Sequence, residues 1–155
     1  MKGADELFFD TTFLADHEIF LTLKETTDAD PAKGWVPAYH FGICKQDNRA
    51  EVGICDLRVG HNQNLYYGGN IGYTIYEPFR GNHYAGKACL LLFQLARKHG
   101  MDYLYITCNP DNTASGKTCE FAGGTLEKTV DLPEDNDMYR EGERQKRIYR
   151  FILCE

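Results

Sequence analysis

The stretch that decides the fold is Ile75-Tyr76-Glu77-Pro78-Phe79-Arg80-Gly81-Asn82-His83-Tyr84-Ala85-Gly86-Lys87-Ala88. A β-rich run, Asn70–Tyr76, leads into a turn of small residues, and the turn opens an amphipathic helix over Ala85–His99. Gly100 suits the position after that helix. The first N–H groups of a helix lack partners within it and carry partial positive charge, so this strand–turn–helix junction favours an anion.

The turn carries residue types suited to phosphate. Gly81, Ala85 and Gly86 are small enough to let phosphate oxygens approach the backbone. Arg80 and Lys87 can add charge-assisted hydrogen bonds. We therefore predict a phosphate-binding loop over Arg80–Lys87.

A nucleotide triphosphatase is one alternative. Gly81–Lys87 matches G-x-x-x-x-G-K, the first seven positions of a P-loop, but Ala88 stands where a Ser or Thr should bind magnesium. Asp56, after Ile54-Cys55, is a poor second magnesium ligand. A P-loop usually lies among βα units, whereas this loop follows four β-rich segments. These departures from the P-loop pattern disfavour a nucleotide triphosphatase.

The order of expected elements indicates a mixed fold. The expected strands before the loop are Glu18–Lys24, Ala38–Lys45, Glu51–Val59 and Asn70–Tyr76. After the helix Ala85–His99, we expect strand Tyr103–Cys108, helix Thr113–Ala122, and strands Thr125–Val130 and Gln145–Leu153 joined by the acidic loop Asp131–Glu143. This order predicts an α/β (α+β) fold, with a mixed, mostly antiparallel sheet flanked by helices, in a single domain over residues 1–155.

Length, charge and cysteine content exclude several classes. A chain of 155 residues is long enough for one sizeable core. A net charge of −6 argues against a nucleic-acid partner. The six cysteines include Cys154 and show no CxxC spacing, which predicts a reduced protein without a metal site. No signal peptide and no apolar run of about 18 residues are present, so we expect a cytoplasmic protein without a membrane partner.

Two motifs resemble a known family. Arg80-Gly81-Asn82-His83-Tyr84-Ala85 resembles the acetyl-CoA signature of the GNAT acetyltransferases, Gln/Arg-x-x-Gly-x-Gly/Ala, with His83 where glycine is usual. The segment from Asn109 to Ser115, with Gly123-Gly124, is similar to that family's strand–helix block. Ile71-Gly72-Tyr73-Thr74-Ile75 resembles the family's fourth strand, most closely in the branch that includes ribosomal-protein N-terminal acetyltransferases.

The N-terminal part resembles the family less. The family places two helices between its first two strands, and here only Glu25–Pro37 is available. Those helices usually wall the acceptor site. The resemblance therefore implies a shortened N-terminal helical region and an acceptor site that is either more open or closed by a neighbouring subunit, as in a homodimer.

The resemblance implies an N-acetyltransferase that moves an acetyl group from acetyl-CoA directly to a primary amine in a ternary complex. The acceptor would be a small molecule or a peptide N-terminus, acetyl-CoA would be the co-substrate, and no metal would be needed. A CoA-binding module without catalysis is the alternative.

The resemblance also implies where the cofactor lies. The pantetheine arm would lie between Asn70–Tyr76 and Tyr103–Cys108, and main-chain groups near Ile75 and Tyr76 would polarise the thioester carbonyl. Asn112 would brace the cofactor, although a helix N-cap role suits it equally. The expected cofactor-binding residues are Ile75, Tyr76, Arg80, Gly81, Asn82, His83, Tyr84, Ala85, Gly86, Lys87, Asn112 and Ser115.

The sequence leaves the identity of the catalytic acid open. In many relatives a tyrosine of the second helix protonates the departing thiolate, and Cys119 aligns with that position. A thiol with a pKa of about 8.5 can donate a proton, yet a cysteine in a helix more often packs in the core. A tyrosine (Tyr73, Tyr76 or Tyr84) or a water could serve instead.

The catalytic base is open as well. Asp56 is the best-placed carboxylate if alternate residues of its strand share a face, and the other interpretation is an ion pair with Arg58. The Asp131–Glu143 loop contains six acids and one arginine. It is either a solvated hairpin loop or a surface that attracts a cationic amine.

Overall fold

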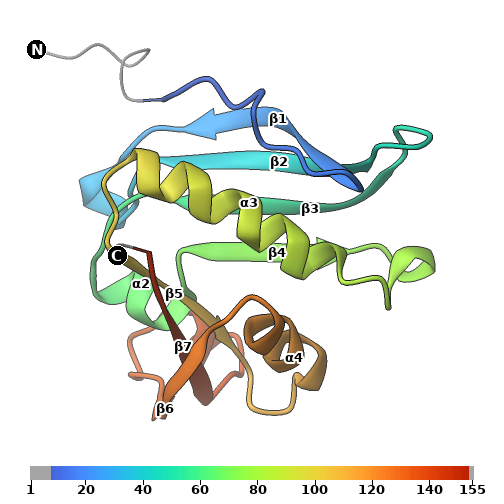
Figure 1. The fold of residues 1–155 in the computed structure, drawn as a ribbon. Coiled ribbons are helices and arrows are strands. Elements are labelled where there is room, and N and C mark those ends of the chain that lie inside the picture. Colours follow the sequence, from blue (N-terminus) through green and yellow to red (C-terminus); the bar gives the residue numbers. More distant parts are fainter. Residues whose placement is uncertain (1–7, 154–155) are drawn as a thin grey trace, which may run out of the picture.

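Two antiparallel sheets form the framework of the computed structural model, which describes residues 8–153 (Figure 1). The first sheet has the order β1 (Ile19–Thr27), β2 (Ala38–Lys45), β3 (Glu51–Arg58) and β4 (Ile71–Ile75). The second has the order β5 (Tyr103–Cys108), β7 (Gln145–Ile152) and β6 (Thr125–Asp131). The predicted α/β class with mostly antiparallel strands is confirmed, although the strands divide into two sheets.

The helices include two that the sequence predicted and two that it did not. The expected helices are α3 (Tyr84–Lys98) and α4 (Thr113–Phe121). The additional ones are the short α2 (Gln63–Gly68) and α5 (Asp137–Arg140). The side chain of Asn62 caps α2 by accepting a hydrogen bond from the Leu65 N–H, an N-cap that the predicted elements did not include.

The main core lies between α3 and the first sheet, where α3 crosses one face (Figure 1). Leu92 and Leu95 of α3 are fully buried, as are Tyr39 and Ile43 of β2. Because side chains alternate along a strand, the intervening residues of β2 point to the other face. That arrangement leaves the second face of the sheet free to carry polar groups.

The connection between β1 and β2 is short. It contains only a 3-10 turn, η1 (Pro31–Lys33), so the predicted shortening of the N-terminal helical region is confirmed. On the sheet face opposite α3, Lys24 forms an ion pair with Glu51 (2.8 Å), and Tyr76 donates a hydrogen bond to the same carboxylate (2.6 Å).

Asn70 marks the point where β4 and β5, which begin side by side, diverge (Figure 1). Its N–H donates to the Tyr105 carbonyl (2.7 Å), and its Oδ1 accepts from the Tyr105 N–H (3.0 Å). Its Nδ2 donates to the carbonyls of Arg58 (3.0 Å) and Gly60 (2.8 Å). Asn70 is fully buried, and these bonds satisfy its amide while joining the two sheets.

The cysteines of the described residues are buried thiols. All five are free, and Cys154 lies outside the described residues. Within residues 8–153, no helix is both long and apolar enough to cross a membrane.

Candidate active site

The loop between β4 and α3 has a constrained backbone. Gly81 has a φ of 89° and His83 a φ of 62°, both in the left-handed region that glycine adopts readily. His83 is the N-cap of α3, and its ring stacks on Phe121 of α4 with 4.6 Å between ring centroids. The loop thus begins α3 and also contacts α4.

A cavity of about 540 Å³, here named the loop cavity, lies between this loop and the start of α4. Nine of the twelve residues predicted to bind the cofactor line it: Ile75, Arg80, Gly81, Asn82, His83, Tyr84, Ala85, Asn112 and Ser115. Lys117 of α4 lines it as well. Lys117 was not among the predicted residues, although it lies three residues after Ala114 on α4 and both line the cavity. The cavity therefore has helix N–H groups and two cationic side chains, Arg80 and Lys117, in its walls.

Three predicted residues do not line the loop cavity. Lys87 instead forms an ion pair with Glu18, just before β1. A Cβ at position 86 would overlap the Phe121 ring, so Gly86 allows α3 and α4 to approach closely rather than admitting phosphate. Tyr76 is exposed, and its hydroxyl is bonded to Glu51.

The edge of β4 that faces away from β3 carries main-chain groups of Ile75. The N–H of Tyr76 donates to the Val52 carbonyl of β3 (2.9 Å). Because hydrogen-bonding direction alternates along an antiparallel strand, the N–H of Ile75 points to the opposite edge. The Ile75 carbonyl lies on that edge too and accepts from the Arg80 Nε (3.0 Å). Of the two residues predicted to polarise a carbonyl, only Ile75 has a suitably directed N–H.

Tyr73 reaches from β4 to the start of α4. Its hydroxyl lies 2.6 Å from the Ser115 Oγ, and the Ser115 N–H donates to the Asn112 Oδ1 (3.1 Å). Asn112 is thus an N-cap that also lines the loop cavity. Burial raises the pKa of Tyr73 well above its ordinary value, so the hydroxyl keeps its proton at neutral pH.

Cys119 lies behind Tyr73 in the core. It is fully buried and lines none of the cavities described here. Burial, with a smaller effect from Cys108, raises the pKa of Cys119 to about 12. The geometry of the described residues favours the core-packing interpretation of this thiol over the catalytic one.

A second cavity of about 550 Å³, the strand cavity, lies on the sheet face opposite α3. Asp56 lines it, as do His40 and Arg58. The Asp56 Oδ1 lies 3.1 Å from the Arg58 Nη2 and accepts from the Gly72 N–H (3.1 Å). Arg58 also donates to the Gly69 carbonyl at the end of α2 (2.9 Å). The predicted ion pair between Asp56 and Arg58 is therefore present.

The loop cavity and the strand cavity share two residues. Tyr73 and Thr74 of β4 line both of them. β4 is therefore the wall between a phosphate-suited cavity and one lined by titratable side chains.

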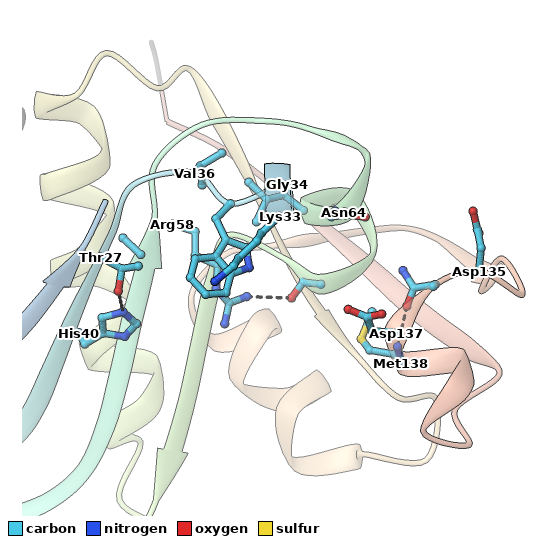
Figure 2. A pocket seen from close by; sticks show the side chains of 15 residues that line it. Thr27, Lys33, Gly34, Val36, His40, Arg58, Asn64, Asp135, Asp137 and Met138 are labelled. Carbon is cyan, nitrogen blue, oxygen red and sulfur yellow. Dashed lines mark hydrogen bonds between the residues drawn. The ribbon is translucent and has the colours of Figure 1, made fainter. Parts of the chain in front are cut away.

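A third cavity of about 560 Å³, the outer cavity, adjoins the strand cavity at His40 and Arg58. Figure 2 shows Thr27 and His40 on one side of it and Asp135 and Asp137 on the other, with Arg58 between them. The acidic residues come from the β6–β7 connection.

A phosphate-suited loop beside two diverging strands is the arrangement that the sequence resemblance implied for an acyl-CoA-dependent acyltransferase. A family model described as an acetyltransferase (GNAT) domain matches residues 4–125. The chain therefore belongs to the GNAT acetyltransferase family. A search of curated protein sequences found no significant match.

Solved structures with a similar fold include several acetyltransferases. The Microcin C7 self-immunity acetyltransferase MccE, in complex with acetyl-CoA and AMP, has 23% identity and a TM-score of 0.58, with 74% of this chain and 61% of that chain covered. RimL, a ribosomal L7/L12 alpha-N-protein acetyltransferase, has 21% identity and a TM-score of 0.58, with coverage of 80% and 73%.

A third similar structure is the Salmonella typhimurium acetyltransferase that modifies the N-terminal serine of 50S ribosomal subunit protein L7/L12. It has 22% identity and a TM-score of 0.58, with 78% of this chain and 66% of that chain covered. The chain spans less than two thirds of the length of the first structures that it matches, with 61% and 66% of those chains covered. At these identities the likeness establishes the fold.

Proposed function

We propose that this chain transfers the acetyl group of acetyl-CoA to a primary amine of a small molecule or a peptide N-terminus, directly and within a ternary complex. The observation that carries the proposal is that the loop cavity and the strand cavity meet at Tyr73 and Thr74. Two substrates can therefore approach β4 from opposite sides at the same time. Direct transfer then needs no covalent acyl-enzyme.

The residues of the loop cavity fit an acyl-CoA. The N–H groups at the start of α3 suit a diphosphate, and Gly81 has no side chain to block their approach. Arg80 and Lys117 supply the charge to balance it. The Ile75 N–H, directed away from β3, is the proposed donor to the thioester carbonyl, where negative charge develops during attack.

The Tyr73 hydroxyl is the proposed donor to the departing sulfur. It lines the loop cavity, and the Ser115 Oγ at 2.6 Å holds it in place. The hydroxyl is protonated at neutral pH, so it can donate to the sulfur as negative charge develops there. In this scheme Cys119 packs behind the site and transfers no proton.

The acceptor amine is proposed to occupy the strand cavity and to extend into the outer cavity. Asp135 and Asp137 line the outer cavity across from Lys33 and Arg58, and these two carboxylates can contact a cationic group of the acceptor. Since RimL acts on a ribosomal protein N-terminus, peptides with a free N-terminus are the first acceptors to test.

Two measurements test the proposal. Thermal shift with CoA, acetyl-CoA and Mg-ATP reports the cofactor, and a ligand at 100 times its Kd should add about 2.7 kcal/mol of stability. A panel of peptides and small amines, with detection of free CoA thiol, reports turnover. Stabilisation by Mg-ATP alone, or binding of acetyl-CoA without thiol release above background for every amine, would contradict the proposed enzyme.

A further inference from the structure

We infer that His40 takes the proton that the acceptor amine loses before it attacks, an inference that rests on the proposed function. His40 lies on β2 and lines both the strand cavity and the outer cavity. Together with Arg58 it forms the place where these two cavities meet (Figure 2). An amine bound across both cavities therefore contacts the region of this imidazole.

The carboxylate of Asp56 is engaged by two partners within the protein. Its Oδ1 contacts both Arg58 (3.1 Å) and the Gly72 N–H (3.1 Å), and its Oδ2 lies 3.4 Å from the Arg58 Nη2. A proton on this carboxylate would remove the partner of a half-buried guanidinium. Asp56 is therefore better suited to position Arg58 and β4 than to accept a proton from the amine.

The surroundings of His40 suit a proton acceptor. Its Nε2 lies 2.8 Å from the Thr27 Oγ1 on β1, a contact that fixes the orientation of the ring (Figure 2). When Nε2–H donates to Thr27, Nδ1 carries the free lone pair. An imidazole with one unprotonated ring nitrogen can accept a proton, and histidine is the side chain that most often acts as a general base.

Charged groups around His40 come from both neighbouring strands. On β1, Glu25 is its partner in the strand register, and Lys24 is engaged with Glu51 (2.8 Å). On β3, Asp56 is its register partner and is paired with Arg58. Glu25 lines the strand cavity together with His40, so its carboxylate borders the space in which the ammonium group of the acceptor would lie.

One ammonium proton of the acceptor moves through water in the strand cavity to the His40 Nδ1 and then to solvent, because His40 lies two strands away from β4 in the sheet. The nitrogen lone pair forms the C–N bond to the thioester carbonyl carbon, and the C–S bond breaks. The second amine proton ends on sulfur, by way of the Tyr73 hydroxyl.

The test compares two acceptors in the wild type, in His40→Gln and in the control His17→Gln. His17 has an 85% exposed side chain and lines none of the three cavities. One acceptor is an alkylamine, protonated at neutral pH, and the other is hydroxylamine, which is neutral there and needs no base. The readout is kcat/KM from thiol release between about pH 6 and 9, with the uncatalysed rate subtracted.

With the alkylamine, His40→Gln should lower kcat/KM about 100-fold at neutral pH, and this loss should shrink as the pH rises and more of the amine is already unprotonated. With hydroxylamine the same variant should stay within about threefold of the wild type, because no proton has to be removed first. That retained activity also shows that the variant is folded. Free imidazole should restore alkylamine turnover in His40→Ala.

Two results would overturn the inference while the proposed function stands: an equal loss with both acceptors, or no loss with either. A wild type that binds acetyl-CoA and releases no thiol with any amine would overturn both together.

Discussion

The two halves of the candidate site are built from different parts of the polypeptide. The loop cavity is mainly a backbone site, made by the loop after β4 and the first turns of α3 and α4. The strand cavity is a side-chain site, made by His40, Asp56 and Arg58 on one sheet face. A backbone site follows from the order of elements and a few small residues, whereas a side-chain site depends on strand register. β4 belongs to both halves, and its attachment to β5 holds them together.

The largest effect is expected at Asn70, which joins the two sheets. Asn70→Ala removes three side-chain hydrogen bonds from a fully buried position, so urea denaturation should show a loss of about 3 kcal/mol in the free energy of unfolding. Asn48→Ala, at an exposed turn, should cost less than about 1 kcal/mol. Equal losses for the two variants would contradict the inference that the hydrogen bonds of Asn70 between the two sheets stabilise the fold.

Tyr73→Phe tests the proposed role of the Tyr73 hydroxyl, which belongs to a residue that lines both the loop cavity and the strand cavity. Loss of the hydroxyl should lower kcat about 10- to 100-fold and leave the KM for acetyl-CoA within about twofold, because the ring still packs in place. Tyr76→Phe is the matched control, since the Tyr76 hydroxyl contacts Glu51 outside the cavities. Steady-state kinetics with thiol detection distinguishes them. A greater loss of kcat in Tyr76→Phe would restore Tyr76 as the catalytic tyrosine.

Substitutions of the two cationic residues in the predicted phosphate loop should have different effects on the KM for acetyl-CoA. Arg80→Gln should raise the KM for acetyl-CoA about tenfold, because Arg80 lines the loop cavity. Lys87→Gln should change it by less than about twofold, because Lys87 pairs with Glu18. Calorimetric titration with CoA checks the same ranking, and a larger effect at Lys87 would contradict the arrangement of this loop.

The smallest effect on turnover is expected for Cys119→Ala. Loss of the buried sulfur should cost about 1 kcal/mol of stability and leave kcat unchanged. Because burial raises the folded-state pKa of Cys119 from 9.0 to about 12, the folded chain retains a proton that the unfolded chain releases. Stability from this source is full below pH 9.0 and is lost toward pH 12. The melting temperature of Cys119→Ala should therefore fall less steeply over that range, and a changed pH profile of kcat would return Cys119 to the mechanism.

The sequence predicted the backbone half of the site better than the side-chain half. The turn residues around Gly81 and the N-cap at Asn112 are local signals, and both residues line the loop cavity. The motif Gly81–Lys87 predicts that Lys87 binds phosphate, because Lys87 directly follows Gly86. A helix turns by about 100° per residue, and this rotation directs Lys87 to Glu18 instead.

The side-chain half required information that lies far apart in the chain. His40 meets Asp56 through the pairing of β2 with β3, and it meets Thr27 through the pairing of β1 with β2. No spacing within a single segment encodes those meetings. The role of Asn70 at the junction likewise depends on Tyr105, 35 residues later.

The short connection between β1 and β2 also bears on how such an enzyme can diversify. The segment from Asp28 to Pro37 borders the outer cavity through Lys33, Gly34 and Trp35, and no residue in it lines the loop cavity. Insertions or replacements in this segment can therefore alter the outer cavity, the proposed acceptor site, without changing the residues that line the loop cavity. Directed evolution toward new acceptors should therefore vary the segment from Asp28 to Pro37 first.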